Sequence, residues 1–191
     1  MEVHKTMKRD TKCSDLGEAN IGQEVCVAGW VNVRRDLGGL IFVELRDSSG
    51  KLQLVADPNI NKEAHQIFSN LRSEFVIIAK GKLTKRPEGT QKADQSSGTV
   101  ELYPSEVILL NTAAPLAFQL DQAASVDEGL RLKYRFLDLR RPEMQHNLRT
   151  RHNVTNAIRM YLDKAGFIEV ETPILTKATP EGARDFIVPS S

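Results

Sequence analysis

The chain has 191 residues, 40% of them hydrophobic and 27% charged, a composition typical of a folded protein with one full domain and part of another. The formal net charge of +1 neither indicates nor excludes a nucleic-acid partner, because phosphate binding depends on local basic patches. No apolar run approaches the roughly 18 residues of a membrane helix, and the first residues lack the hydrophobic segment of a signal peptide, so we expect a cytoplasmic protein that does not bind membranes.

Residues 1–20 are polar and irregular, which predicts an arm lying on the first domain. The two cysteines, Cys13 and Cys26, fit no metal-ligand spacing and are too few for a disulfide framework, so we expect free thiols. The first strand follows as VCVAGWVNVRRD, in which Gly29 indicates a bulge or a sharp bend. Its inward positions are expected to be Val25, Val27, Val31 and Val33.

The segment 40–55, LIFVELRDSSGKLQLV, predicts a β-hairpin that reverses at residues 47–50. Because side chains alternate along a strand, its inward set is Ile41, Val43, Leu45, Leu52, Leu54 and Ala56, and its outward set is Leu40, Phe42, Glu44, Arg46, Lys51, Gln53 and Val55. An outward ring at Phe42 beside an outward amide at Gln53 suits a nucleobase, since the ring can stack and the amide can form two hydrogen bonds. The alternative is that Phe42 is covered by a helix or the chain terminus and that Gln53 is solvated.

The next segments complete a barrel. Asn61 is expected to cap a helix over 62–71, and strands are expected over 75–83 and 99–110, separated by a loop rich in Pro, Gly and Ser. Five strands with a helix between the third and fourth predict an all-β OB-fold barrel, which commonly binds oligonucleotides across strands two and three. On the last strand Glu101 and Tyr103 point outward, and Glu101 could accept a hydrogen bond from a cytosine amine. A solvated surface glutamate is the alternative.

Residues 111–130 contain few large hydrophobic side chains and predict a hinge. The basic run 131–151 that follows is either a solvated face or a surface that contacts phosphates. Pro142 and Gly166 suit the two ends of a long helix with an apolar stripe, and a strand is expected over 167–170. One helix and a strand or two cannot close a core, so residues 131–191 predict an incomplete second domain. The predicted order is arm (1–20), barrel (21–110), hinge (111–130) and second domain (131–191).

Three long motifs, GWVNVRRDLGGLIFVELRD, RLKYRFLDLRRPEM and GFIEVETPILTKATPEGARDFIVPS, resemble bacterial-type aspartyl-tRNA synthetase over nearly the whole chain. The resemblance implies that the barrel is the anticodon-binding domain and that residues 131–191 are the start of the α+β catalytic domain of class II synthetases. It also implies that Phe42 stacks on the middle anticodon base, that Gln53 hydrogen-bonds that base, and that Arg35 and Glu101 contact the neighbouring positions. Strand alternation places three of these four outward, and a bulge near Gly29 could reorient Arg35.

In the second domain, the resemblance places Pro173 at a homodimer interface and Glu181, in the mobile loop 179–185, in contact with the substrate aspartate. The Pro and Gly of this loop fit a plain turn equally well. The implied reaction is ATP-dependent attachment of L-aspartate to tRNA(Asp) through aspartyl adenylate, with Mg²⁺ balancing the phosphate charge.

The sequence departs from the family at Val33, where arginine is common, and at the final Ser190-Ser191. The motifs that hold ATP and Mg²⁺ in the family are absent from this sequence, so we expect no catalytic residue, metal ligand or cofactor site here, and an inactive chain. The alternative function is a standalone RNA-binding or regulatory module without catalysis. Acceptance of tRNA(Asn) is left open.

Overall fold

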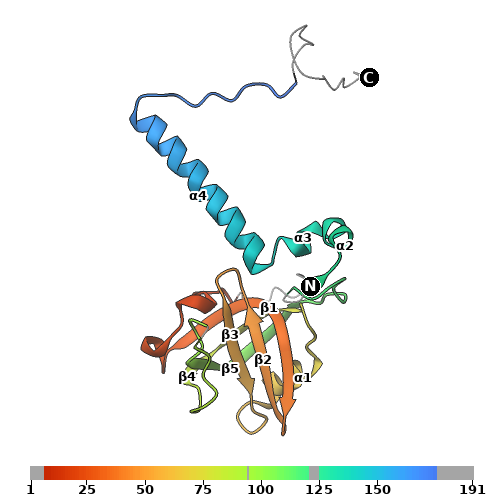
Figure 1. Ribbon diagram of the computed structural model, residues 1–191. Coiled ribbons are helices and arrows are strands. Elements are labelled where there is room, and N and C mark those ends of the chain that lie inside the picture. The colour runs from red at the N-terminus through yellow and green to blue at the C-terminus, as the bar shows by residue number, and fades with distance from the viewer. Residues whose placement is uncertain (1–6, 94, 121–124, 176–191) are drawn as a thin grey trace. The chain divides into compact units, whose positions relative to one another are not determined.

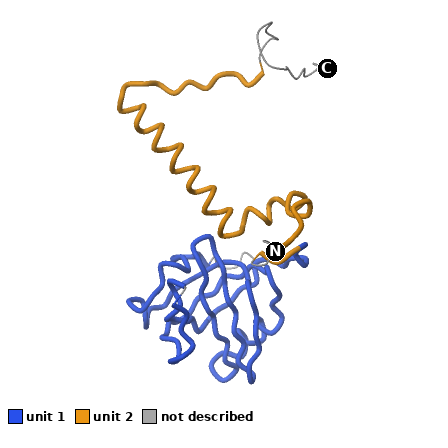
Figure 2. The backbone as a smooth tube through the Cα atoms, in the orientation of Figure 1, with its two compact units in different colours: residues 1–117 blue, residues 118–191 orange. Residues whose placement is uncertain are grey.

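The computed structural model describes residues 7–93, 95–120 and 125–175. The chain divides into two compact units, residues 1–117 and residues 118–191, which Figure 2 shows in blue and orange. Among the helices that the structure describes, none is long and apolar enough to cross a membrane.

Unit 1 is a closed five-stranded barrel (Figure 1). Its strands are β1 (Glu24–Leu37), β2 (Leu40–Arg46), β3 (Lys51–Ala56), β4 (Val76–Lys85) and β5 (Val100–Asn111), hydrogen-bonded in the order β1-β2-β3-β5-β4. Helix α1 (Lys62–Asn70) lies between β3 and β4 in sequence and begins at Asn61, whose side chain accepts a hydrogen bond from the Ala64 amide at 3.1 Å. The predicted OB-fold, its helix and its hairpin are therefore confirmed.

The barrel interior is filled by the alternating apolar side chains of the strands. All six inward positions predicted for the hairpin are 2% exposed or less, and Phe68 of α1 is fully buried against the same core. Val55, predicted to point outward, is also buried, although it does not belong to this core cluster. Strand alternation therefore placed the Val55 side chain correctly outside the barrel core but did not predict that it would be buried.

The first strand contains a β-bulge at Asn32. Val31 pairs with Leu45 and Val33 pairs with Glu44, so one residue of β1 has no partner on β2. An extra residue reverses the alternation beyond it. The prediction that Val33 points inward is therefore wrong, because Val33 shares the outer face of its partner Glu44. Gly29, at which a bulge or bend was expected, instead lies where a Cβ would collide with the Arg46 carbonyl oxygen.

The arm before β1 contains two short 3-10 turns, η1 (Cys13–Asp15) and η2 (Glu18–Asn20). Cys13 and Leu16 are buried in the barrel core, and both cysteines are free thiols, as predicted. The Asp10 amide donates to the Cys26 carbonyl at 3.1 Å, and the Asp10 carboxylate accepts from the Cys26 amide at 3.0 Å. The arm thus pairs with the early part of β1 and contributes apolar side chains to the core.

Unit 2 contains three helices, α2 (Glu128–Lys133), α3 (Arg135–Asp138) and α4 (Pro142–Lys164). The carboxylate of Asp138, 1% exposed, lies 2.8 Å from Arg135 and 3.1 Å from Arg141. Part of the predicted basic run is therefore engaged in ion pairs within this unit.

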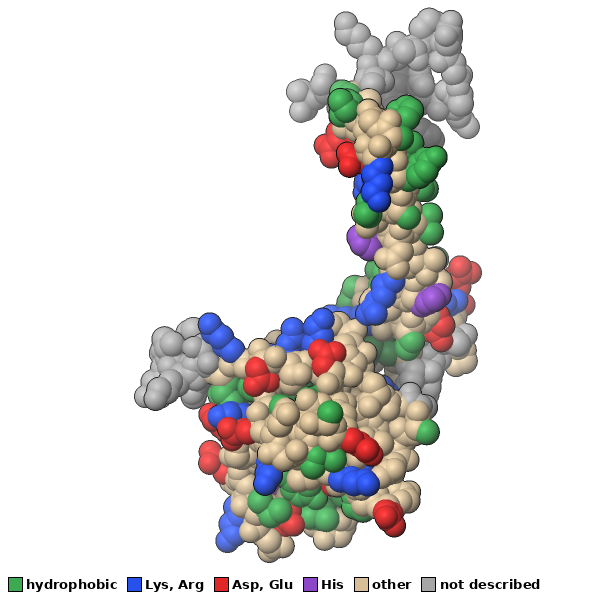
Figure 3. All heavy atoms as spheres, turned by 90° about the vertical axis from the view of Figure 1, so that its left-hand side faces the viewer, with side chains coloured by type: hydrophobic (Ala, Val, Ile, Leu, Met, Phe, Trp, Pro, Cys, Tyr) green, Lys and Arg blue, Asp and Glu red, His purple; other side chains and the backbone are tan. Residues whose placement is uncertain are grey.

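Helix α4 has the predicted ends, with Pro142 in its first turn and Gly166 beyond its last turn at φ +85°. The apolar positions of α4 from Leu148 onward are exposed, and Figure 3 shows hydrophobic side chains along the helix surface. The strand predicted over 167–170 is absent: residues 167–175 are irregular and exposed. A strand needs a hydrogen-bonding partner, and the described residues of unit 2 contain no other strand to pair with it.

Candidate nucleic-acid interface

The outer face of β1, β2 and β3 carries a small hollow with polar and aromatic walls. We call it the Phe42 surface and define it by the residues that line it: Val33, Arg35, Phe42, Glu44, Gln53 and Lys92. Three of the four residues predicted for base contact lie here. They come from three strands, so only the sheet pairing brings them together.

The position of Arg35 depends on the bulge at Asn32. Arg35 pairs with Phe42 across β1 and β2, and Phe42 in turn pairs with Val55 of β3. Without the extra residue, Arg35 would share the parity of the inward Val31 and point into the barrel. The bulge places an exposed guanidinium directly beside a half-buried ring. A cation and a π surface at this spacing suit the phosphate and the base of one nucleotide.

Gln53 and Glu101 are partners in the short parallel pairing of β3 and β5. The Gln53 Nε2 donates to Glu101 Oε2 at 2.8 Å, and the Tyr103 hydroxyl donates to Glu101 Oε1 at 3.2 Å. A carboxylate only accepts hydrogen bonds, so it fixes the Gln53 amide with its NH₂ toward Glu101. The other edge of the amide is then available for a base.

Glu101 lies on the outer face of the barrel as alternation predicts, but it is only 3% exposed. The alternative that it is a solvated surface glutamate is therefore wrong. Burial and the carboxylate of Glu101 raise the pKa of Tyr103 to about 12, so the phenol keeps its proton and remains a hydrogen-bond donor at neutral pH. The structure thus presents Glu101 as a group that orients Gln53, with each of its oxygens accepting one hydrogen bond.

A charged network crosses the same surface. Glu44 accepts from Lys92 and Lys51, each at 2.9 Å, and from the Asn32 side chain at 2.8 Å. Burial alone would raise the pKa of Glu44, but the hydrogen bonds from Lys92 and Lys51 outweigh burial and lower it to about 2. Glu44 is therefore ionised at neutral pH and holds two lysines on the face that carries Phe42.

The network continues away from the hollow through Arg46. Arg46 donates to the side-chain Oδ1 of Asn32 at 2.8 Å and to both carboxylate oxygens of Glu74, at 2.9 and 2.8 Å. Asn32, the bulged residue, thereby connects Glu44 to Arg46. These contacts stabilise the bulge on which the orientation of Arg35 depends.

Sequence reasoning missed Lys92 and the role of Glu44. Lys92 lies in the β4–β5 loop, whose irregular sequence has no periodicity from which its position could be inferred. Glu44 was placed outward, but no sequence signal indicated its partners. Alternation along β2 was the only indication that a charge would stand next to Phe42.

Two further site residues were predicted in the second domain. Glu181, with the loop 179–185, lies outside the residues that the structure describes. Pro173 is exposed in the irregular segment after α4. Across residues 7–93, 95–120 and 125–175, no group of three or more His, Cys, Asp or Glu is arranged to hold a metal ion.

Comparison with known protein families gives two matches along the chain. Residues 25–110 match the model described as "OB-fold nucleic acid binding domain", and residues 127–191 match "tRNA synthetases class II (D, K and N)".

Among curated proteins, the aspartate–tRNA(Asp/Asn) ligase of Thermodesulfovibrio yellowstonii is 56% identical over 184 residues, which cover 96% of this chain and 31% of that protein. The aspartate–tRNA ligase of Listeria monocytogenes is 49% identical over 183 residues, with 96% and 31% covered. The chain spans about a third of the length of these relatives.

Among solved structures, a putative aspartyl-tRNA synthetase from Leishmania major aligns with a TM-score of 0.80 at 21% identity, over 93% of this chain and 37% of that one. Asparaginyl-tRNA synthetase from Pyrococcus horikoshii complexed with asparaginyl-adenylate aligns with a TM-score of 0.78 at 24% identity, over 93% and 39%. At these identities the likeness shows a shared fold.

Proposed function

We propose that the Phe42 surface reads the anticodon of tRNA(Asp). The proposal proceeds from the family, because the chain belongs to the bacterial-type aspartyl-tRNA synthetases of class II and corresponds to the amino-terminal portion of the family's members. Phe42 stacks on the middle base, Gln53 hydrogen-bonds its edge, and Arg35 acts on a neighbouring position. Glu101 acts through Gln53, whose amide it orients. The observation that carries the proposal is the convergence of these groups, from four strands, on one outer face of an OB-fold.

The chemistry of this face supports base binding more than binding of phosphate alone. An aromatic ring contributes stacking that tolerates any base, whereas an amide held in one orientation discriminates between base edges. Glu101 supplies that orientation through its 2.8 Å hydrogen bond to Gln53. Arg35, Lys51 and Lys92 add positive charge near the ring, which favours the RNA backbone.

We further propose that the complete enzyme attaches L-aspartate to tRNA(Asp) through aspartyl adenylate, using ATP with Mg²⁺ to balance the phosphate charge. The described residues contain no group suited to a metal ion, and we assign none of them to ATP or Mg²⁺. Glu181 is proposed to contact the aspartate.

A homodimer is proposed through α4 and the segment that contains Pro173. The apolar positions of α4 support this proposal, because a helix with Leu148, Val154 and Ile158 exposed gains from burial against another surface. Sedimentation of the chain at increasing concentration tests it, since a dimer predicts an increase in mass that Ile158→Glu reduces.

The decisive experiment for anticodon reading is a binding comparison between two RNAs. The chain should bind a transcript of tRNA(Asp) more tightly than the same transcript with a changed anticodon, at one salt concentration. Equal affinity for both transcripts would contradict anticodon reading and favour a general RNA-binding module.

A further inference from the structure

Glu74, in the turn between α1 and β4, combines a left-handed backbone with a buried charge. Its φ is +67°, and among the residues that the structure describes it is the only one other than glycine with a positive φ. It is 6% exposed. A left-handed backbone strains a residue that has a Cβ, and a buried carboxylate needs a partner. Strained residues of this kind cluster at functional sites, where the surrounding contacts hold them in place.

Two sets of contacts hold Glu74, one made by its backbone and one by its carboxylate. The Glu74 amide donates to the Val31 carbonyl at 2.7 Å, and the Val31 amide donates to the Phe75 carbonyl at 2.8 Å. The two oxygens of the Glu74 carboxylate lie 2.9 and 2.8 Å from Nη2 of Arg46. The other terminal nitrogen of Arg46, Nη1, donates to the Asn32 side chain at 2.8 Å. Glu74 therefore contacts β1 directly at Val31, and it reaches the next residue of β1 through Arg46.

These contacts meet where the bulge of β1 begins. Val31 is the last residue of β1 to pair with β2 before the unpaired Asn32. The turn at Glu74 fixes the backbone of Val31, and Arg46 fixes the side chain of Asn32. Together they determine which residue of the strand is the extra one. If the extra residue were lost from this position, the alternation would continue unbroken and Arg35 would point into the barrel.

On the basis of the proposed anticodon-reading function, we infer that Glu74 is a positioning residue for that function. It keeps the bulge at Asn32 and thereby keeps the Arg35 guanidinium on the Phe42 surface. Glu74 is not among the residues that line this surface, so its effect on RNA passes through Arg35.

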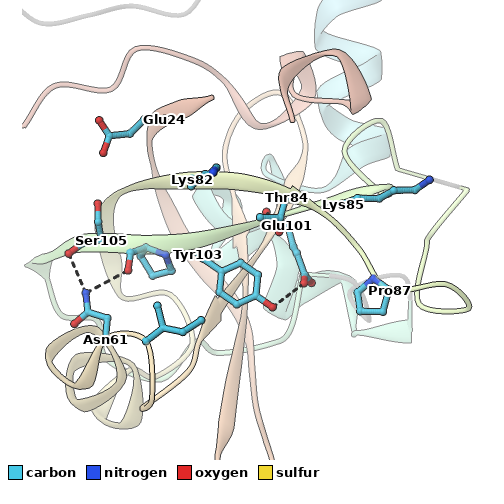
Figure 4. A pocket seen from close by; sticks show the side chains of 11 residues that line it. Glu24, Asn61, Lys82, Thr84, Lys85, Pro87, Glu101, Tyr103 and Ser105 are labelled. Atoms are coloured by element: carbon cyan, nitrogen blue, oxygen red, sulfur yellow. Dashed lines mark hydrogen bonds between the residues drawn. The ribbon is translucent and has the colours of Figure 1, made fainter. Parts of the chain in front are cut away.

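The barrel contains another acid that orients a base-reading group without reading a base itself. Glu101 accepts a hydrogen bond from Gln53 at 2.8 Å and one from the Tyr103 hydroxyl at 3.2 Å, the second of which Figure 4 shows. Glu101 acts on a single side chain, whereas Glu74 acts on the register of a strand. Because Gln53 and Glu101 belong to β3 and β5, a change at Glu74 should leave their hydrogen bond intact.

The test is a double-variant cycle in the 191-residue chain with a synthetic anticodon stem-loop of tRNA(Asp), measured well below the melting temperature of each protein. Arg35→Ala should weaken binding about tenfold, within the range for one lost base contact. Glu74→Gly removes the carboxylate and suits the left-handed backbone, and it should weaken binding to a similar degree. In the Arg35→Ala background, Glu74→Gly should change the affinity by less than about twofold, while its effect on the melting temperature should be the same in both backgrounds.

Arg46→Lys is a second variant for the same cycle, and it decides the question if Glu74→Gly does not fold. It keeps a positive charge beside Glu74, but one ammonium group replaces the two nitrogens that bind Glu74 and Asn32. It should weaken binding as Arg35→Ala does and have no further effect in that background. Glu63→Gln, which removes a negative charge from the exposed side of α1, is the control and should stay within about twofold of the unmodified chain.

Three results would contradict this role of Glu74. Losses in Glu74→Gly and Arg46→Lys that persist in the Arg35→Ala background would mean that the ion pair does not act through Arg35. Unchanged affinity in both variants, with a loss in Arg35→Ala, would leave anticodon reading intact and make the ion pair a stabilising contact alone. Unchanged affinity in Arg35→Ala would remove the arginine from base reading and the inference with it, and if Phe42→Ala is unchanged as well, the proposed function also fails.

Discussion

The Gln53 amide donates a 2.8 Å hydrogen bond to the Glu101 carboxylate across a parallel strand pair, although the two residues are 48 positions apart in sequence. Each residue was expected to contact RNA separately. The structure makes them one unit, in which the buried acid orients the amide. This relationship changes what their substitution is expected to do.

Gln53→Ala should narrow the difference in affinity between cognate and anticodon-changed tRNA by about 1–3 kcal/mol, the range for a lost bidentate base contact. Glu101→Ala should narrow it as well, and the double variant should lose little more than either single one, because both act through one hydrogen bond. Binding titrations with both tRNAs measure the effect. Additive losses would show that the two residues act independently, and equal losses for every tRNA would show that neither of them reads a base.

Phe42→Ala should weaken tRNA binding by about 1–3 kcal/mol, because a base loses its stacking surface. Phe42→Tyr is the matched control and should bind nearly as well as the unmodified chain. Filter binding of each variant measures base stacking by the ring, and a thermal melt of each variant measures its contribution to packing. Unchanged affinity together with a lowered melting temperature would mean that the ring serves packing.

Glu44→Gln should lower the free energy of unfolding of the barrel by about 1–3 kcal/mol at pH 7, because it removes the charge that holds Lys51 and Lys92, both about one-third exposed. The pKa of Glu44 is lowered from its ordinary value of 4.5 to about 2. Its stabilisation is therefore complete above about pH 4.5 and is lost as the pH falls toward 2.

Urea unfolding between pH 7 and pH 2.5 measures this effect, followed by the fluorescence of Trp30, the only tryptophan. The difference in free energy of unfolding between the unmodified chain and Glu44→Gln should shrink as the pH falls from about 4.5 toward 2.5. A difference that stays constant with pH would show that the ionised form of Glu44 does not stabilise the fold.

Asp47→Ala should destabilise the barrel by about 2–3 kcal/mol. One carboxylate oxygen accepts from the Cys13 amide at 2.9 Å, and the other accepts from the Ser49 and Gly50 amides at 2.7 and 3.0 Å. Their loss leaves donors without partners in a partly buried turn. Asp47→Asn keeps one acceptor oxygen, so it should lower the free energy of unfolding, measured with urea, by roughly half as much as Asp47→Ala. Identical losses in the two variants would contradict the account in which each carboxylate oxygen accepts its own hydrogen bonds.

Gly29→Ala should destabilise the barrel by about 1–3 kcal/mol, because the new methyl group meets the Arg46 carbonyl of the neighbouring strand. Gly17→Ala is the control, since nothing lies within 4 Å of its Cβ position and its φ of −159° is ordinary extended backbone. Its change should stay within about 0.5 kcal/mol. Equal melting temperatures for the two variants would contradict the steric account.

Much of the barrel follows from local patterns in the sequence. The alternation of apolar and polar residues over 40–55 correctly predicted the hairpin, its six buried side chains and the outer face of Phe42 and Gln53. Asn61 correctly predicted the start of α1. These predictions hold because strand alternation and helix capping depend on neighbours within a few residues.

The failures arise where distant segments decide the outcome. The strand expected over 167–170 is absent from the described residues of unit 2, where no second strand pairs with it. Val33 points outward because the bulge forms at Asn32, where the side chain bridges Glu44 and Arg46 of β2.

The sequence by itself determined that this protein has an OB-fold barrel, that an aromatic ring and an amide share one outer face, and which family its motifs resemble. Only the tertiary structure decided that Arg35 joins that face, that Glu101 is buried against Gln53, and that Lys92 reaches Glu44 from a loop. The reason is physical: alternation is a property of one strand, whereas bulges, ion pairs and burial depend on which strands pair and in what register.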